Sequence, residues 1–356
     1  MKRPTIADIA KEAGVSKGAV SYALNGQPGV SPQTRQRILA IADRLGFRAN
    51  SAARALAGVP AKVVGLALPR PPATLGVEPF FMELISGLEA ELSTRSYALL
   101  LQMVAHQDEE IGFYRRWWSE SRVGGVLVCD LRVHDERVGA LRELGLPAVV
   151  IGPPSAAGGL ASIWSDDGVS MVEAVEYLAA LGHRRIARIS GMSELAHTAI
   201  RTEAFTGVCA RLGVSAVTVP TDYSAEHGAD ATRRLLGADD RPTALIYDND
   251  IMAIAGLTVA QELGLSVPAD LSIVAWDDSP ICRLLHPPLT ALTRDIGAYG
   301  VHAARLLLAA MGNGAGNGAG NGAGDSADGS AGDRPGDVHD EPAHLTPRGS
   351  TAPPSR

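Results

Sequence analysis

Lys17, Gly18, Ser21 and Tyr22 fall on one face of a short helical pattern near the amino terminus. A lysine ammonium and a serine hydroxyl donate hydrogen bonds, and a tyrosine brings both a ring and a hydroxyl. On an exposed helix, such groups reach the edges of nucleic-acid bases and the backbone phosphates. The first chemistry that this sequence offers is therefore recognition rather than catalysis.

Two short helices and a turn must hold this face. Residues 5–26 read TIADIAKEAGVSKGAVSYALNG, in which Thr5 and Asp8 are spaced as a capping box. Gly14 stands where a chain that leaves a helix needs a left-handed residue, and Ser16 can cap the second helix. The inward positions are apolar: Ile6, Ile9, Ala10, Val20 and Leu24. This pattern predicts a helix-turn-helix, whose second helix enters the DNA major groove.

A third helix and a short alanine-rich segment follow. Ser31 and Pro32 form a cap and a first-turn proline, Gly46 ends the helix, and its stripe is apolar: Ile38, Ile41, Ala42 and Leu45. Residues 50–58 read NSAARALAG, which favours a helix too short to persist in water without support.

The net charge of −7 conceals an asymmetry along the chain. Residues 1–60 contain nine lysines and arginines against three acidic residues, a charge of +6, whereas the remainder carries −13. A basic head on an acidic body fits a nucleic-acid-binding module joined to another domain. The 356 residues suffice for two or three domains.

Other chemistries lack a signal. Cys129, Cys209 and Cys282 are widely spaced, and the histidines show no ligand spacing, so we expect neither a disulfide nor a metal. No phosphate-binding loop or nucleophile elbow occurs, and we expect no cofactor. The amino terminus lacks an apolar signal-peptide core, and no apolar run reaches membrane-spanning length. We therefore expect a cytoplasmic, nucleoid-associated protein with no membrane partner.

The chain resembles the LacI/GalR family of bacterial transcription regulators over about residues 3–311. The resemblance rests on TIADIA and AGVS, then VSYALNG, VSPQTR and ARALAG (53–58), and later on LGHRRIARIS (181–190), PTALIYDNDIMAI (242–254) and VPADLSIVAWDDSP (267–280). It implies a regulator, more often a repressor, that binds a pseudo-palindromic operator as a homodimer. A small-molecule effector, most often a sugar or sugar derivative, would control it from a cleft.

The body alternates apolar strands with helices, which predicts parallel sheets covered on both faces. With the head, the expected fold is multidomain: an all-α helix-turn-helix domain and an α/β bilobed, periplasmic-binding-protein-like (Rossmann-like) core. Six segments are predicted: head 1–50, hinge helix and linker 51–62, first lobe 63–158 with 290–311, second lobe 159–289, flexible linker 312–340, and closing segment 341–356.

The tail has two interpretations. Residues 312–333 form a Gly/Asn/Ala-rich repeat with nothing to bury, an insertion relative to the family, and we expect a flexible linker there. The end, HLTPRGST (344–351), resembles the segment that adds a strand to the family's second lobe. The alternative is that the whole tail lacks structure.

The resemblance implies roles in the head. Lys17 and Gly18 would face base edges, and a second group would contact phosphates: Thr5, Ser16, Ser21 and Asn25. Tyr22 stands where the family usually has arginine, so an operator sequence cannot be transferred. It has two interpretations, contact with a base or phosphate, which its outward face favours, and packing on the first helix. Leu56 matches the leucine that wedges open the central base step, with Ala53 allowing close approach; the alternative is an ordinary linker leucine.

Six residues are implied for the effector cleft: Phe80, Arg201, Tyr223, Asn249, Asp277 and Arg294. The forked donors of Arg201 suit paired hydroxyls or a carboxylate, although a surface ion pair with Glu203 or Asp222 is the alternative. Phe80 or Phe81 would line the cleft from the other lobe, although either could instead be plain core, and Asp250 is expected to cap a helix. Arg294, where the family often has glutamine, favours an acidic effector or a phosphosugar.

Two other classes of function compete. A periplasmic-type solute-binding protein would share the two lobes but has no use for a helix-turn-helix. A sugar-processing enzyme would need carboxylates with acid/base spacing, whereas the adjacent Asp277 and Asp278 should point in different directions. The sequence therefore favours a regulator over an enzyme.

Overall fold

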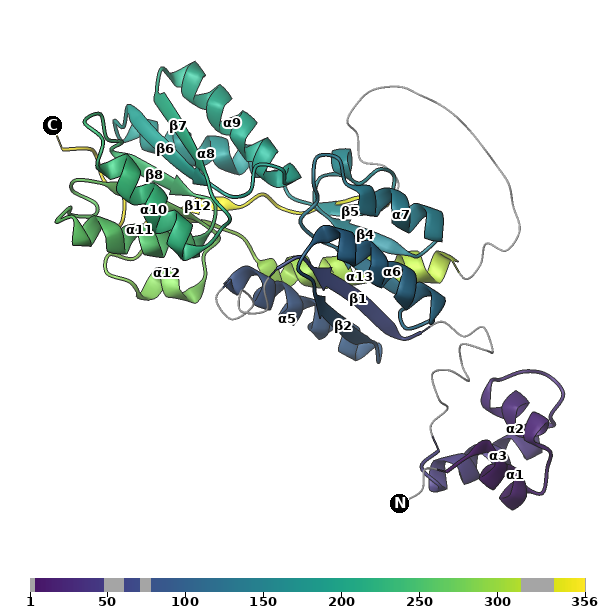
Figure 1. Cartoon of the computed structure of the whole chain (residues 1–356). Coiled ribbons are helices and arrows are strands. Elements are labelled where there is room, and N and C mark those ends of the chain that lie inside the picture. Colours follow the sequence, from purple (N-terminus) through teal and green to yellow (C-terminus); the bar gives the residue numbers. More distant parts are fainter. Residues whose placement is uncertain (1–3, 48–60, 71–77, 315–335, 356) are drawn as a thin grey trace. The chain divides into compact units, whose positions relative to one another are not determined.

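The computed structural model describes residues 4–47, 61–70, 78–314 and 336–355. They belong to two compact units, a helical head and an α/β core, and each is described by itself (Figure 1). The predicted hinge helix, with Ala53 and Leu56, lies outside the described residues.

The head consists of three helices, α1 (Ile6–Ala13), α2 (Lys17–Leu24) and α3 (Pro32–Arg44). The predicted capping box is confirmed: the Thr5 side chain accepts from the Asp8 N–H, and the Asp8 carboxylate accepts from the Thr5 N–H. The Ser16 and Ser31 side chains cap the next two helices by accepting from the N–H groups of Ala19 and Thr34. Ile9, Val20 and Ile38 are fully buried between the helices. Because the inward faces are small and apolar, the three helices close into one core.

The first lobe of the core is a parallel sheet with the strand order β11-β5-β4-β3-β1-β2. Its strands are β1 (Val63–Leu68), β2 (Ala98–Met103), β3 (Gly125–Val128), β4 (Ala148–Ile151), β5 (Ala161–Trp164) and β11 (Val338–His339). Its helices are α5 (Pro79–Thr94), α6 (Gln107–Ser119), α7 (Glu136–Leu144) and α13 (Ile296–Gly314), with a short 3-10 turn η2 (Pro154–Ala156). Helices α5 and α13 cover one face of this sheet.

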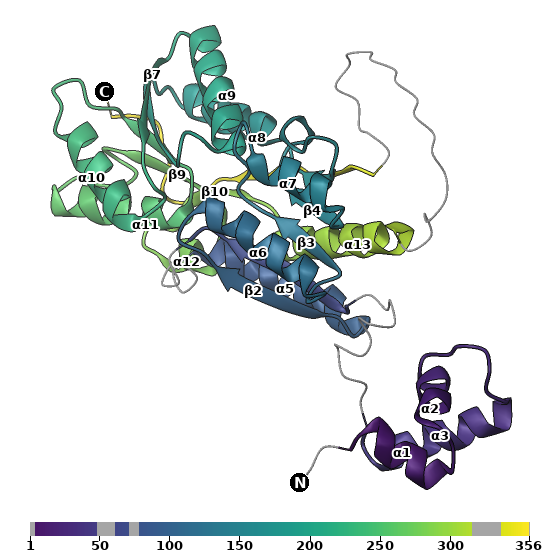
Figure 2. The ribbon, with the colours of Figure 1, turned by 45° about the vertical axis from the view of Figure 1, so that its right-hand side comes forward.

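The second lobe repeats the design with the strand order β12-β10-β9-β8-β6-β7, in which only β12 runs antiparallel to its neighbour. Its strands are β6 (Arg185–Ser190), β7 (Ser215–Pro220), β8 (Ala244–Tyr247), β9 (Ser272–Trp276), β10 (Thr290–Thr293) and β12 (His344–Thr346). Its helices are α8 (Asp167–Ala180), α9 (Ala196–Leu212), α10 (Ala225–Leu236), α11 (Asp250–Glu262) and α12 (Pro280–Leu284). Helices α8 and α9 cover one face, and α10 and α11 cover the other (Figure 2).

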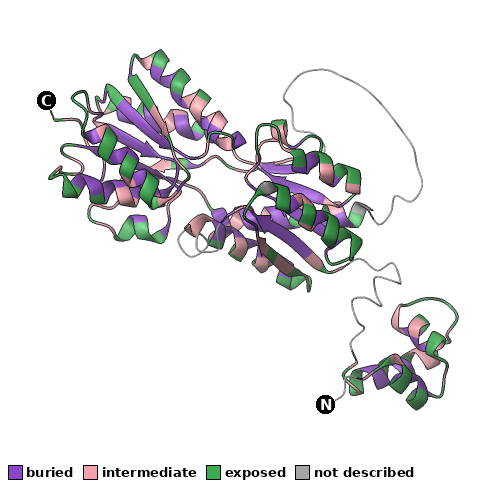
Figure 3. Ribbon diagram, viewed as in Figure 1, coloured by how far each residue is buried: buried purple, intermediate pink, exposed green. Residues whose placement is uncertain are grey.

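Burial explains the strand sequences. Strands β3, β4, β8 and β9 are buried along their whole length, whereas the helices show exposed residues outward (Figure 3). Strands covered on both faces read as continuous apolar runs, which is the pattern that predicted a parallel sheet. Among the helices that the structure describes, none is long and apolar enough to cross a bilayer.

Three predicted boundaries in the core are wrong. The predicted first lobe stopped at residue 158, but β5 pairs with β4 and belongs to the first sheet. The segment 290–311 was assigned to the first lobe, yet β10 pairs with β9 in the second. The predicted linker 312–340 runs too far, because β11 pairs with β5. The chain passes between lobes after β5, β10 and β11, where short strands lead directly into the crossings.

The closing segment is held on the second lobe. β12 pairs with β10, the Ser350 hydroxyl donates to the Ile273 carbonyl at 2.6 Å, and Ser350 is fully buried. His183, also buried, lies with Nε2 at 3.0 Å from the Ala352 carbonyl. The alternative of a wholly unstructured tail is therefore wrong for residues 336–355.

Candidate functional site

The outward face of α2 is accessible. Ser16, Lys17, Gly18 and Tyr22 are exposed, and the Tyr22 side chain remains 47% accessible. Tyr22 is therefore not buried against the first helix, and its ring lies beside Gly29. At Gly18 a built Cβ would meet nothing closer than the Ser16 hydroxyl at 3.8 Å, so the backbone there is open to a partner.

The hydroxyls around α2 differ in what they can still donate. The Ser16 oxygen accepts from the Ala19 N–H at 3.1 Å, which leaves its own hydrogen available. Ser21 likewise accepts from the Asn25 amide at 3.4 Å. The Thr5 hydroxyl instead donates to Asp8 at 2.7 Å, so a phosphate would have to compete with that carboxylate. Ser16 and Ser21 are thus better placed than Thr5 to donate to a phosphate.

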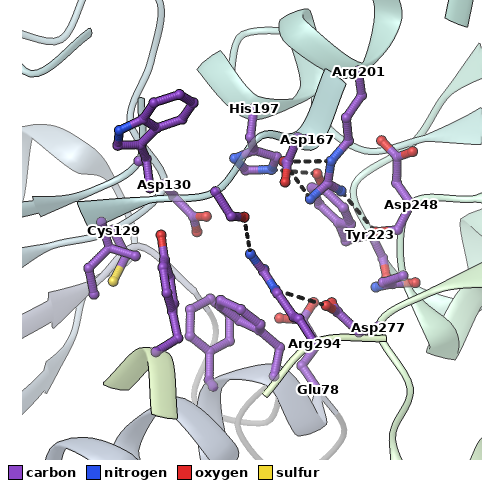
Figure 4. Close-up of a pocket in the computed structure, with 18 of the residues that line it drawn as sticks. Glu78, Cys129, Asp130, Asp167, His197, Arg201, Tyr223, Asp248, Asp277 and Arg294 are labelled. Atoms are coloured by element: carbon purple, nitrogen blue, oxygen red, sulfur yellow. Dashed lines mark hydrogen bonds and ion pairs between the residues drawn. The ribbon is translucent and has the colours of Figure 1, made fainter. Parts of the chain in front are cut away.

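The core carries a cleft between its two lobes, with about 930 Å³ of empty space that is partly open to solvent. It lies where strands of both sheets end, as expected of open α/β sheets. All six residues implied for the effector line it: Phe80, Arg201, Tyr223, Asn249, Asp277 and Arg294. Figure 4 shows side chains from both lobes pointing into this space.

Arg201 is anchored on the wall of the cleft. Its guanidinium donates to Asp167 at 2.9 Å (Figure 4). It also lies 3.6 Å from the centre of the Trp276 ring. The alternative partners proposed from the sequence, Glu203 and Asp222, are wrong, because α9 turns Arg201 inward toward α8. Stacking and ion pairing fix the orientation of the remaining N–H donors.

Asn249 and Tyr223 shape the adjoining wall. The Asn249 oxygen accepts from the Met252 N–H at 2.9 Å, and its amide donates to the Tyr223 carbonyl at 3.0 Å. The prediction that Asp250 caps α11 is therefore wrong: Asn249 is the cap, and Asp250 is the first helical residue. The Tyr223 hydroxyl lies 2.7 Å from Nε2 of His197, and its ring fills the space beside Gly191, where a Cβ would come within 1.8 Å.

Asp277 and Arg294 face each other across 3.8 Å, and Arg294 also donates to the Ser165 hydroxyl at 2.9 Å. The Arg294 guanidinium lies over the rings of Phe80 and Tyr299, at 5.5 and 5.2 Å from their centres. Phe80 thus lines the cleft, whereas Phe81 is 3% exposed and also belongs to the core. Asp278 turns the other way to Arg348, at 2.6 Å, so the two adjacent aspartates do not form a pair.

The sequence-based prediction missed six of the nine acidic and basic residues that line the cleft. The missed residues are Arg70, Glu78, Asp130, Asp167, His197, Asp248 and Asp250, together with Trp164. A usable signal was present, because Arg70, Asp130 and Asp248 each follow a strand end by one or two residues. Polar residues directly beyond parallel strands are the ones that meet at the ligand edge of the sheet.

Backbone strain gathers at the same place. Asp130, Tyr223 and Asp277 have φ values of 51°, 70° and 63°, a conformation that residues with a side chain rarely adopt. Such strain costs roughly 1–3 kcal/mol per residue and concentrates at ligand sites. All three residues line the cleft, which supports a binding role for it.

Burial shifts the pKa values of the acids in the cleft. It raises the pKa of Glu78 to about 7, opposed by Arg70 and reinforced by Asp130, Asp250 and Asp277. It raises the pKa of Asp250 to about 6, opposed by a hydrogen bond from Ser279 and reinforced by Asp277. The pKa of His197 falls well below its ordinary value through burial and the charge of Arg201, so its imidazole is neutral. Two acids are therefore poised to take up protons near neutral pH.

Several buried polar atoms in the cleft have no hydrogen-bond partner within the described residues. Apart from Oδ2 of Asp130, which has an ion pair with Arg70 at 2.7 Å, they are Nε1 of Trp164, Nε of Arg70 and of Arg294, Oδ2 of Asp250 and Oδ1 of Asp277. Buried polar groups in folded proteins are normally satisfied. Because donors and acceptors are mixed, the cleft suits a ligand rich in groups that both give and receive hydrogen bonds.

The fold and these sites define a class of protein: a helix-turn-helix head joined to a two-lobed core that resembles periplasmic binding proteins. Residues 5–50 match the model for bacterial regulatory proteins of the lacI family, and residues 175–351 match the periplasmic binding protein-like domain. The catabolite control protein A of Priestia megaterium is 30% identical over 86% of this chain and 92% of its own. The chain belongs to the LacI family of bacterial transcriptional regulators, which are not enzymes.

Solved structures agree. A LacI family transcriptional regulator from Bifidobacterium animalis subsp. lactis aligns with a TM-score of 0.71 and 35% identity, over 83% of this chain and all of that one. The complex of the transcriptional regulator CelR with cellobiose aligns with a TM-score of 0.69 and 26% identity, over 98% of this chain and 100% of that one.

Proposed function

We propose that this regulator is a repressor that binds a pseudo-palindromic operator as a homodimer, acting at the nucleoid in the cytoplasm. We further propose that a hydroxyl-rich small molecule, a sugar or sugar derivative, binds in the cleft and controls it. The observation that carries the second part is the set of unpartnered donors and acceptors lining the cleft. The structurally similar regulator CelR, which was solved in complex with cellobiose, supports the same class of ligand.

In the proposed complex, Lys17 and Gly18 of α2 face base edges and Tyr22 contacts a base or a phosphate. Lysine can donate to guanine O6 and N7, whereas Gly18 admits the backbone to the groove. Phosphate contacts come from Ser16 and Ser21, whose hydroxyl hydrogens remain available, and from Asn25 and Thr5. These contacts fix the register and carry no sequence information themselves. Ala53 and Leu56 are proposed to enter the minor groove from the partner-supported hinge.

A second copy of the chain is proposed to pack on the face formed by α5 and α12. Met82, Ile281 and Leu284 are 51%, 44% and 83% exposed there, although all three are large and apolar. The two helices lie within electrostatic range of each other, since the charge of Arg283 in α12 lowers the pKa of Glu83 in α5 against the larger effect of burial. Because α5 belongs to the first lobe and α12 to the second, a change in the lobe angle would alter this contact. Dimers read two half-sites roughly one helical turn apart.

The proposed control links the two sites. Arg294 follows β10 and bonds to Ser165, which follows β5, so a ligand at Arg294 touches two of the segments that join the lobes. A ligand that prefers one lobe angle shifts the population toward it, and the spacing of the heads changes accordingly. DNA and effector affinities are then linked by the same factor in both directions.

The test begins with genome-wide mapping of the DNA bound by the full chain, followed by anisotropy titrations of a recovered operator. Lys17→Ala should lose about 1–3 kcal/mol and relax base preference, and Leu56→Ala should weaken operator binding without affecting the fold. Lys11→Ala, on the exposed side of α1, serves as a matched charge control. Unchanged operator affinity in both variants would overturn the proposed contacts.

A further inference from the structure

The charges in the cleft do not cancel in pairs. Its three arginines each face a carboxylate: Arg70 and Asp130 at 2.7 Å, Arg201 and Asp167 at 2.9 Å, Arg294 and Asp277 at 3.8 Å. A further lining carboxylate, Asp248, is held from behind by two bonds from the fully buried Arg188. Two acids remain, Glu78 and Asp250. Glu78 approaches a cation only at 3.9 Å, and that cation, Arg70, is already bound more closely by Asp130.

These two acids come from opposite lobes. Asp250 begins α11 in the second lobe, is 3% exposed, and has one carboxylate oxygen without a hydrogen-bond partner among the described residues. Glu78 precedes α5 in the first lobe, with a side chain 13% exposed. Across the cleft, Asp250 and Asp277 of the second lobe raise the pKa of Glu78, and within the second lobe Asp277 raises the pKa of Asp250. Like charges that face each other from two lobes resist closure unless something positive lies between them.

We propose that the effector carries a positively charged amine and that this amine lies between Glu78 and Asp250. The inference rests on the proposed function, since it names the chemical class of the ligand in the same cleft. An ammonium group brings three donors and one positive charge, and it satisfies the open oxygen of Asp250 and the carboxylate of Glu78 together. A small polyhydroxylated ring that bears an amino group, such as an amino sugar, also uses the unpartnered N–H of Trp164 and the donors of Arg294.

The other ligand charges fit less well. A phosphosugar or sugar acid, which Arg294 alone would suggest, must enter a cleft in which every arginine already faces a carboxylate. Adding an anion there leaves more negative charge than the arginines can balance, at a high desolvation cost. A neutral sugar donates hydrogen bonds to both acids but brings no charge, so one of them must hold a proton instead. The charges of the lining residues therefore favour an amine over an anionic sugar and over a neutral sugar.

The test is a comparison of matched sugars by calorimetric titration of the full chain at pH 7.5. The probes are glucose, glucosamine, N-acetylglucosamine and glucose 6-phosphate, with the galactose and mannose series alongside. At least one amine should bind ten-fold or more tightly than its hydroxyl, acetylated and phosphorylated counterparts. Tighter binding of a neutral or phosphorylated member, or no binding by any of the three amines, overturns the proposal.

Two variants tie the preference to the acids. Glu78→Gln and Asp250→Asn should each reduce the amine preference at least ten-fold, whereas Glu226→Gln, an exposed acid of α10, should leave it unchanged. Circular dichroism checks that each variant is folded. If Asp250→Asn does not fold, Glu78→Gln alone is sufficient for the test. A preference that persists in folded Glu78→Gln overturns the placement. Operator binding, measured separately, tests the proposed function: operator binding without amine preference refutes only this inference.

Discussion

Replacing Glu78 by glutamine should increase the free energy of unfolding of the core at pH 8 and change that free energy little at pH 5. Burial raises the pKa of this carboxyl from 4.5 to about 7, against the opposing charge of Arg70 and with the help of three neighbouring acids. Glutamine has the shape of the protonated acid but never ionises. The variant therefore removes the cost of holding a carboxylate in this part of the cleft.

The sign follows from proton binding. The folded state holds the proton of Glu78 up to about pH 7, whereas the unfolded chain releases it near 4.5, so stability is lost as pH rises between the two. At 1.36 kcal/mol per pH unit over that interval, the loss approaches roughly 3 kcal/mol above pH 7. At pH 5 it is below about 1 kcal/mol, because pH 5 lies only half a unit above the unfolded pKa of 4.5 and ionisation has so far stabilised the unfolded chain only slightly.

The assay is urea unfolding of the full chain without ligand, followed by tryptophan fluorescence at pH 5, 6 and 8. Trp117 and Trp276, in different lobes, are both buried and report loss of the core. The free energy of unfolding of Glu78→Gln should exceed that of the parent by an amount that grows with pH. Glu226→Gln, at an exposed helix start, should differ by less than about 1 kcal/mol throughout. A constant difference at all three pH values, or destabilisation at pH 8, would refute the reasoning.

Three further substitutions test the architecture. Arg137→Met should cost about 3–5 kcal/mol in urea unfolding, since it leaves the fully buried Glu110 without its 2.7 Å ion pair, whereas exposed Arg142→Met should cost less than about 1 kcal/mol. Thr5→Ala should remove about 1 kcal/mol from α1, seen as faster amide hydrogen exchange there, and unchanged exchange would contradict the capping box. Gly191→Ala should cost about 1–3 kcal/mol, because its Cβ overlaps the Tyr223 ring, and a neutral result in the same assay would show that the ring moves freely.

The head was predictable because local rules decide it. Three capping residues predict where the helices begin, and all three side chains act as caps in the structure: Thr5, Ser16 and Ser31. The lobes were predictable as alternating strands and helices for a similar reason, because continuous apolar runs belong to strands covered on both faces. The predictions were wrong where the chain passes from one lobe to the other. Strand β11 is two residues long and β5 and β10 are four each, too short for a period to assign them to one sheet.

The cleft was predictable residue by residue but not as a charge distribution. The family resemblance placed six side chains around one space, and the structure brings all six together. The partners of those side chains lie far away in the sequence: Arg201 pairs with Asp167, and Arg294 bonds to Ser165. Spacing along one helix or strand carries no information about such pairs, because two separate elements must dock before the pair exists.

The partners that Arg294 has in the fold change the ligand charge that this residue indicates. Taken alone in the sequence, a cation in place of the usual glutamine favours an anionic ligand. In the fold, its guanidinium lies 3.8 Å from Asp277 and covers the rings of Phe80 and Tyr299, so its charge already has a partner. The acids without an arginine of their own are Glu78 and Asp250, and they decide the sign of the remaining charge. The charge preference of a buried cleft thus depends on which acids must share an arginine or have none, and only the folded structure reveals this.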